Sequence, residues 1–392
     1  MKSFKQSKTL ENLPQQFFAK LVKDVNKVTS EGHNVINLAQ GNPDQPTPGD
    51  IVQSAQEAVE NPLFHKYSPF RGYPFFKEAA SEFYKREYNV DIDPETEVAV
   101  LFGGKAGLIE VSQCLLDEGD IALVPDPGYP DYWSGISLAK AEMVPMPLHE
   151  KNDFLPDYSL LDKGSLAEAK LMFLNYPNNP TGAIATADFF SETVGLAKDN
   201  DFCVVHDLAY GAIGFEGEKP LSFLQTEGAK DIGIEIYTLS KTYNMAGWRV
   251  GFAVGNPSVI AALNLLQDHL HCSLFGGVQK AAATALTSSQ ESVKNLVSLY
   301  ENRRNFLMER LHEIGWEAQA PKGSFFAWLP VPEGFTSESF FKVLLEEAHV
   351  AVAPGTGFGE YGEGYVRVGL LQDEEILAEA VRRIGELGLF KQ

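Results

Sequence analysis

The sequence predicts an α/β fold with a mostly parallel sheet and a second, smaller α+β unit. Between residues 47 and 285, short apolar runs alternate with helical stretches, which is typical of a parallel sheet covered by helices on both faces. The 392 residues exceed a single typical core, and 44% hydrophobic residues suffice to bury more than one. The chain shows no internal repeat and no low-complexity linker, so we expect the two units to pack together.

The first part of the chain predicts a helix and then a change of character. Residues 15–32 carry apolar side chains at helical spacing and end at Gly32, a helix stop. A proline-rich stretch at 43–48 follows, and beyond it the strand candidates begin. We expect strands at 98–102, 121–125, 171–175, 203–207, 234–238 and 250–254.

The last hundred residues predict the smaller unit. A long polar helix is expected at 292–315, a strand at 323–331, and a final helix containing Ile376, Ala380 and Ile384. We therefore divide the chain into an N-terminal arm that contributes to the small domain (1–46), a large domain (47–285) and a small C-terminal domain (286–392).

Composition limits the partners and the compartment. Lys and Arg number 32 against 53 Asp and Glu, a formal charge of −21 that repels phosphate backbones and anionic membranes. We therefore expect neither a nucleic-acid partner nor a membrane partner. The three cysteines are widely spaced in apolar surroundings, as buried free thiols would be, and the first residues lack the apolar core of a signal peptide. These features indicate a cytoplasmic protein.

Lys241 lies in a short segment that carries several groups suited to one chemistry. The segment follows the predicted strand 234–238 and includes Thr238, Ser240 and Arg249. A fixed cation near an amine favours its neutral, nucleophilic form, as a Schiff-base lysine requires. The two hydroxyls and the guanidinium suit a phosphate dianion. Alternatively, Lys241 is one of the chain's surface lysines.

Two further segments add to this pattern. Residues 203–207 form an apolar run that ends in Asp207, with Tyr210 three positions later, and a carboxylate at a strand's carboxyl end lies where open α/β sheets keep their ligands. Residues 171–175 run into a turn with Asn179, Pro180, Thr181 and Gly182. Each has a plainer interpretation, because an Asp after a strand often caps a helix and the second segment is good turn chemistry.

Together these segments make the chain resemble the class I and II aminotransferases, the fold-type I family that uses pyridoxal 5′-phosphate, over nearly its whole length. The resemblance implies that the large domain binds this cofactor, that Lys241 forms the Schiff base and carries the substrate's proton, and that Asp207 pairs with the ring nitrogen. Its other implied cofactor contacts are Tyr210 and Asn179 to the ring oxygen, Thr238, Ser240 and Arg249 to the phosphate, and Tyr129 on the ring face.

Gly104 and Lys105 are implied to offer backbone amides to the phosphate. An independent argument supports them, because residues 97–116 read as a strand, a glycine turn and a helix, and a helix N-terminus binds phosphate. For the substrate, the resemblance places Arg367 on the α-carboxylate and brings the Gly41 backbone and Asn179 close. It also implies a homodimer in which Tyr67 reaches the neighbouring subunit's phosphate.

One departure from the family is visible. Many members have Asp-Glu-x-Tyr where this chain has Asp207, Leu208, Ala209 and Tyr210. The Asp-to-Tyr spacing is kept, so the departure concerns the branch of the family and not the chemistry.

Three other patterns could mislead. Gly357, Gly359 and Gly362 match the spacing of a dinucleotide fingerprint, but no strand-to-helix context follows. The group His269, His271 and Cys272 lacks a second ligand pair, so a partly buried helix end is the better interpretation. His206 is expected to be a core residue or a support for Asp207.

Substrate preference depends on the segments expected to border the site. They carry Phe17, Phe18, Tyr67, Phe70, Tyr132 and Phe275, although half or more of these could be ordinary core. An apolar wall would favour the oxo acid of methionine or of an aromatic amino acid over oxaloacetate, because it offers no partner for a second carboxylate. Several segments resemble methionine-salvage aminotransferases, with an amide or aromatic donor, and also diaminopimelate aminotransferases.

Two other functions stay open at this point. The same site can perform β-elimination, as in the carbon–sulfur lyases of the superfamily. The fold can also serve as the ligand-sensing module of a transcription regulator, which would need a basic DNA-binding domain that the sequence does not show.

Overall fold

A seven-stranded sheet forms the centre of the computed structural model, which describes residues 2–14 and 16–390. The strand order is β2-β8-β7-β6-β5-β3-β4, and only β8 runs antiparallel to its neighbours. The mostly parallel sheet predicted from the sequence is confirmed. Its strands are β2 (Val98–Leu101), β3 (Ile121–Asp126), β4 (Glu142–Pro147), β5 (Ala169–Leu174), β6 (Cys203–Asp207), β7 (Gly233–Thr238) and β8 (Gly251–Gly255).

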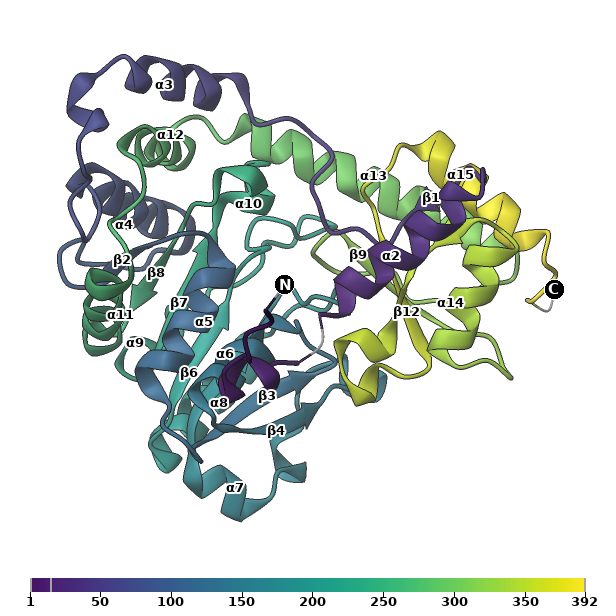
Figure 1. Ribbon diagram of the computed structural model, residues 1–392, viewed down its shortest axis with the longest axis horizontal. Helices are drawn as coiled ribbons and strands as arrows, with labels where there is room; N and C mark the ends of the chain where they lie inside the picture. The colour runs from purple at the N-terminus through teal and green to yellow at the C-terminus, as the bar shows by residue number, and fades with distance from the viewer. Residues whose placement is uncertain (1, 15, 391–392) are drawn as a thin grey trace.

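Helices cover both faces of this sheet (Figure 1), so its strands are buried on both sides. Alternate strand residues point to opposite faces, so Val205 packs with one layer and Val204 with the other. The first layer contains α5 (Gly104–Leu115), α6 (Asp131–Ala139) and α11 (Pro257–Leu270). The second contains α4 (Pro74–Tyr88), α8 (Ala187–Asn200) and α12 (Gly276–Thr287), with α3 (Gly49–Val59) packed against α12.

The smaller unit has its own sheets and its own core. A three-stranded antiparallel sheet has the order β11-β12-β9, and the short strand β1 near the N-terminus pairs in parallel with β10. Its strands are β1 (Ile36–Asn37), β9 (Phe326–Pro330), β10 (Val350–Ala351), β11 (Ala353–Pro354) and β12 (Tyr365–Gly369). Its helices are α2 (Phe17–Ser30), α13 (Glu291–Glu313), α14 (Ser337–Glu346) and α15 (Glu374–Gly385).

The N-terminal segment thus joins the C-terminal part of the chain. Leu21, Val25 and Val28 of α2 are buried in the same cluster as Leu344 of α14. In Figure 1 the purple α2 crosses the yellow-green small unit on the right, while α13 runs between the two units. Residue 15, the first position of the predicted helix, lies outside the described residues.

The remaining helices are short. They are α1 (Lys8–Glu11), α7 (Lys163–Glu168), α9 (Ala229–Ile232) and α10 (Leu239–Thr242). None of the helices in the described part of the chain has both the length and the apolar character needed to cross a membrane. Cys114, Cys203 and Cys272 are free and half-buried, so the expectation of buried thiols holds only in part.

Strand β4 is the one strand of the seven-stranded sheet that was not expected from the sequence. It contains Pro145 and Pro147, it pairs only with β3, and most of its residues are exposed or half-buried. Proline is tolerated on an edge strand because one side of the backbone needs no hydrogen bonds. The apolar-run criterion detects buried strands and therefore passes over this one.

Candidate active site

The predicted site residues meet at one edge of the large sheet. Parallel strands place their carboxyl ends together, so the residues that follow β2, β5, β6 and β7 become neighbours. The antiparallel β8 begins at this same edge, since Gly251 lies opposite Thr238, and this brings Arg249 to the site. A cavity of about 490 Å³ lies here.

Residues of both units line this cavity. Its lining includes Gly41, Gly104, Lys105, Tyr129, Asn179, Asp207, Tyr210, Thr238, Ser240, Lys241, Arg249 and Arg367. These are twelve of the thirteen site residues named from the sequence. Tyr67 is the thirteenth; it is 89% exposed and lies outside this chain's cavity. Its predicted contact is with a neighbouring subunit, so it stays a prediction.

Lys241 extends from the short helix α10 into the cavity. Its Nζ donates a hydrogen bond to the carbonyl oxygen of Gly41 at 2.7 Å. Burial, helped by the nearby charges of Arg367 and Arg249 and opposed by Asp207, lowers the pKa of Lys241 to about 8. A substantial fraction of the amine is therefore neutral at mildly alkaline pH, as a nucleophile requires.

Hydroxyl groups and amides form a cup beside Lys241. Thr238 caps α10, with its Oγ1 accepting from Ser240 N at 3.2 Å and donating to Ser240 Oγ at 2.8 Å. Helix α5 begins at Gly104, so its first amides face the same space. Gly103 has a φ of +86°, and a Cβ there would lie 2.5 Å from Arg249 Nη2. Glycine is needed for the guanidinium to approach the helix start.

Asp207 lies at the end of β6 and is buried. Tyr132 donates a hydrogen bond to its Oδ2 at 2.9 Å, and the backbone N–H of Ala209 also bonds to its carboxylate. Burial raises the pKa of Asp207 to about 6, while the hydrogen bond from Tyr132 opposes the rise. A cationic ligand atom beside this carboxylate would favour its charged form.

Arg367 on β12 is a buried cation. Its Nη1 donates to Asn179 Oδ1 at 2.7 Å and its Nη2 to the Ala39 carbonyl at 2.9 Å, while the Phe326 ring centroid lies 3.9 Å from its Cζ. Burial lowers the pKa of Arg367 to about 10. Within the described chain, no carboxylate lies within 4.0 Å of it, and its Nε has no hydrogen-bond partner. The remaining donors suit an incoming carboxylate.

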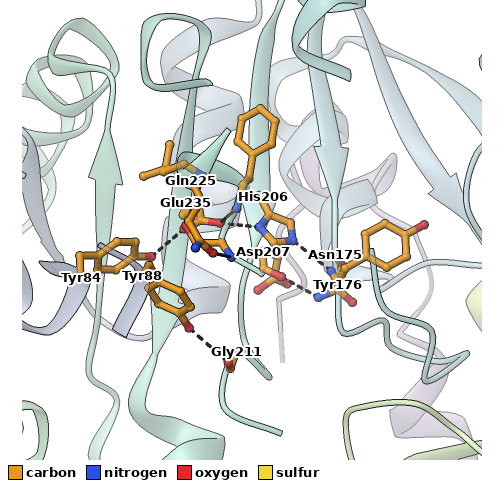
Figure 2. A network of polar contacts seen from close by, with 12 residues as sticks. Tyr84, Tyr88, Asn175, Tyr176, His206, Asp207, Gly211, Gln225 and Glu235 are labelled. Atoms are coloured by element: carbon orange, nitrogen blue, oxygen red, sulfur yellow. Dashed lines mark hydrogen bonds and ion pairs between the residues drawn. The ribbon is translucent and has the colours of Figure 1, made fainter. Parts of the chain in front are cut away.

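A fully buried network supports the strands behind the site (Figure 2). Glu235 on β7 accepts hydrogen bonds from His206 Nδ1, Tyr84, Ser222 and the Phe223 amide at 2.5–3.0 Å. His206 Nε2 accepts from Tyr176 N, which fixes the imidazole as a neutral ring protonated at Nδ1. His206 is thus a core residue, as expected, and it ties β6 to β7 and to the turn that carries Asn179.

Three supporting residues were not recognised as such from the sequence. Tyr132, expected in the substrate wall, is buried against Asp207 instead. Asn175 donates to the Asp207 carbonyl and accepts from Asn179 N, so it fixes the relative position of two site residues. Gly103, the neighbour of Gly104, was not named from the sequence. A polar residue at the end of an apolar run was the available signal for Asn175.

The aromatic wall expected from the sequence is mostly wrong for this chain's own cavity. Phe18 lines the cavity, while Phe17 packs behind it on Phe358. Tyr67, Phe70 and Phe275 are exposed at positions away from the lining. The apolar lining consists instead of Phe18, Leu108, Ala209, Ala246 and Phe326. His271 follows the last residue of α11, as the helix-end interpretation predicted.

The fold and the site together define an α/β enzyme that holds a reactive amine among anion-binding groups. A family model described as aminotransferase class I and II matches residues 33–384. A glutamine–4-(methylsulfanyl)-2-oxobutanoate aminotransferase of Bacillus subtilis is 66% identical over 389 residues, covering 99% of this chain and 98% of the relative. An LL-diaminopimelate aminotransferase of Dehalococcoides mccartyi is 43% identical, covering 97% and 98%.

Solved structures agree with these relatives. A substrate-bound structure of BacF from Bacillus subtilis superimposes with a TM-score of 0.95 at 50% identity and covers 99% of both chains. The chain belongs to the class I and II aminotransferases. It is therefore a transaminase, and its substrates are amino acids and 2-oxo acids. The family uses pyridoxal 5′-phosphate.

The buried amine gives a stability prediction for the cofactor-free protein. A pKa that falls from 10.5 to about 8 means that burying the ammonium costs about 3 kcal/mol. The cost is fully present below pH 8 and disappears as the pH rises toward 10.5, because the unfolded chain then also loses the proton. Lys241→Met should therefore raise the free energy of unfolding at pH 7 by about 1–3 kcal/mol, and the gain should shrink at pH 10.

Denaturant unfolding of cofactor-free protein at the two pH values measures this difference. Lys163→Met, at the exposed first position of α7, is the control and should change the free energy of unfolding little. A cofactor-free Lys241→Met variant less stable than wild type at pH 7 would show that Lys241 is held by favourable contacts and not against its charge.

Proposed function

We propose that this transaminase binds pyridoxal 5′-phosphate and transfers an amino group from glutamine or an aromatic amino acid to the 2-oxo acid of methionine. One observation carries the acceptor preference: the described residues that line the cavity contain no third arginine beside Arg249 and Arg367. The 66% identical relative, named for the same acceptor with glutamine, supports it.

The groups at the site fit this cofactor. A phosphate dianion needs several donors and a cation, which the Thr238–Ser240 hydroxyls, the start of α5 and Arg249 offer. Arg249 has no carboxylate within 4.0 Å in the described chain, so its charge is available. The buried Asp207 carboxylate suits a protonated ring nitrogen, and Lys241 supplies the amine that would hold the aldehyde covalently.

The proposed contacts are those that the family resemblance implies for these residues. Asp207 would pair with the ring nitrogen, Tyr210 and Asn179 would hydrogen-bond the ring oxygen, and Tyr129 would stack on the ring. Thr238, Ser240, Arg249 and the amides of Gly104 and Lys105 hold the phosphate. The side chain of Lys105 has a separate contact, because its Nζ forms an ion pair with the buried Asp131 at 2.8 Å.

Each of these residues has its own role in the proposed reaction. When bound, the cofactor supplies an electron sink for the substrate's α carbon. Arg367 binds the α-carboxylate through a bidentate fork, and the Gly41 backbone borders the same space. Lys241 Nζ would take the proton from the substrate's α carbon and pass it to the cofactor, and its depressed pKa favours the neutral amine that this role needs.

The acceptor preference follows from what the cavity lacks. A distal carboxylate, as in oxaloacetate, would lie against Phe18, Ala246 or Phe326 without a partner, and an unpaired buried carboxylate is costly. A thioether would instead make favourable sulfur contacts with the rings of Phe18 and Phe326, worth about 0.3–1.5 kcal/mol. The discrimination should therefore come mainly from rejecting the second charge.

Initial rates with a panel of substrates test this proposal. With glutamine as donor, kcat/KM for the methionine oxo acid should exceed that for oxaloacetate by about tenfold or more, and phenylpyruvate should also be accepted. The panel should include 2-oxoglutarate as a second dicarboxylate. A faster reaction with oxaloacetate would contradict the proposal, because the remaining cation of the described lining, Lys105, is paired with Asp131.

Additional substrates distinguish the proposed function from the two alternatives, a diaminopimelate aminotransferase and a carbon–sulfur β-lyase. Diaminopimelate aminotransferases at 43% identity keep that activity open, and a higher rate with LL-diaminopimelate and 2-oxoglutarate than with glutamine and the methionine oxo acid would favour it. Pyruvate and ammonia released from a cysteine conjugate without any oxo acid would identify a β-lyase.

We further propose that the protein is a cytoplasmic homodimer with the site at the subunit interface. Exposed apolar side chains lie close to Tyr67 in the chain, including Leu63 (63%) and Phe70 (55%), as expected of a segment that another subunit covers. In this arrangement residues 47–285 form the large cofactor-binding domain, and residues 1–46 join 286–392 in the small domain.

Mixed subunits test the shared site. Tyr67→Phe should weaken cofactor binding about tenfold through loss of a charge-assisted hydrogen bond, and Lys241→Ala should be inactive. Co-expression of the two variants should restore on the order of a quarter of wild-type activity at limiting cofactor, because half of the dimers are mixed and each has one complete site. No recovery in demonstrably mixed dimers would mean that Tyr67 does not act across the interface.

A further inference from the structure

The glycine-rich loop 355–362 of the small unit is attached to the end of strand β3 in the large unit. The loop consists of η6 (Gly355–Phe358) and η7 (Glu360–Gly362). The backbone N–H groups of Glu360 and Tyr361 donate to the two carboxylate oxygens of Asp126 at 3.1 and 3.0 Å. Gly128 N donates to the Phe358 carbonyl at 2.7 Å, so the contact involves both chain segments.

The glycines of this loop are required by the contact. Gly359 has a φ of +133°, and a Cβ at this position would overlap the Asp126 carboxylate. The spacing of Gly357, Gly359 and Gly362 resembled a phosphate-binding fingerprint, and the amides of Glu360 and Tyr361 do bind an anion. That anion is a carboxylate of the same chain.

Asp126 depends on these amides. It is 9% exposed, and within the described chain no cation lies within 4.0 Å of it. Burial raises the pKa of Asp126 to about 6, while the hydrogen bonds from Tyr361 and Glu360 oppose the rise. A buried carboxylate without a cation is costly unless its donors are in place, so the carboxylate favours the docked position of the loop.

The loop carries an aromatic ring that packs against Arg367. Phe358, next to Gly359, is fully buried, and its ring centroid lies 4.6 Å from the Arg367 guanidinium carbon. The same ring packs against Phe17 and Phe18 at 5.7 and 6.0 Å between centroids. Phe358 therefore covers Arg367 on one side, while Phe326 covers it at 3.9 Å.

We propose that Asp126 is a positioning residue for transamination: by fastening loop 355–362 it holds Phe358 against Arg367 and keeps the guanidinium aimed at the substrate's carboxylate. This inference rests on the proposed role of Arg367. Asp126 contacts neither the cofactor groups nor the cavity, so it acts only through the loop.

The variants Asp126→Ala and Asp126→Asn test the role of the carboxylate. Asp126→Ala should raise KM about tenfold for every amino acid and 2-oxo acid alike, because all share the α-carboxylate. The kcat should fall less than about threefold and the cofactor dissociation constant should change less than about twofold. Asp126→Asn should give an intermediate KM, since its amide oxygen can still accept one of the two N–H groups. Asp91→Asn, at an exposed position, is the control.

Gly359→Ala tests the same contact from the loop. Its Cβ should displace the carboxylate and raise KM as Asp126→Ala does. In the double variant the two effects should not add, because both remove one interaction. Additive effects would overturn the proposal, and so would an unchanged KM in a folded single variant or an equal loss of cofactor affinity.

Arg367→Lys separates this proposal from the proposed function. If Arg367→Lys raises KM for all substrates while Asp126→Ala does not, the loop contact has no positioning role and the substrate site stands. If neither variant raises KM, the assignment of Arg367 to the carboxylate fails as well.

Discussion

Positive charge is concentrated at the carboxyl edge of the large sheet without matching carboxylates. Lys241, Arg249 and Arg367 all reach one cavity, and within the described residues none of the three has an ion-pair partner within 4.0 Å. The chain as a whole carries a net charge of −21, so this local excess is a property of the site and not of the surface. A site of this kind is completed by anionic ligands, and two anions, a phosphate and an α-carboxylate, match its two arginines.

The rest of the structure holds these cations in place. Thr238 ends β7, Ser240 follows it in α10, and Arg249 precedes β8, so the pairing of β7 with β8 sets the separation of these groups. Arg367 belongs to the other sheet, so the substrate side of the site depends on how the two units meet. Contacts such as that of Asp126 with the loop 355–362 therefore matter to substrate binding, although Asp126 is absent from the cavity lining.

Much of the fold could be predicted because its strands are buried. Strands such as β6 are continuous apolar runs, and a polar residue at the end of the run, here Asp207, marks the ligand edge. The edge strand β4 lacks this signal because its residues are largely exposed. Strand β1 has two residues and is defined only by its partner β10, more than 300 residues later in the chain, so no local pattern could reveal it.

How much of the site could be predicted depends on whether its residues are neighbours in the chain. Residues such as Lys241 and Arg249 belong to one short segment, and the resemblance to a family named them before any geometry was known. Tyr132 and Asp126 act through contacts with residues far along the chain, so neither could be assigned from its neighbours. Exposure was also unpredictable for Tyr67, which lies outside the cavity of its own chain.

The thermal stability of the cofactor-free protein with added ligands tests the central claim most directly. A ligand that binds only the folded state raises the unfolding temperature, so pyridoxal 5′-phosphate should raise it far more than pyridoxal, which lacks the phosphate. Arg249→Gln should remove most of that difference, while Arg382→Gln, at an exposed position, should leave it unchanged. Equal shifts with both ligands, or a difference that survives Arg249→Gln, would contradict the account that unpaired cations at the sheet edge hold the phosphate.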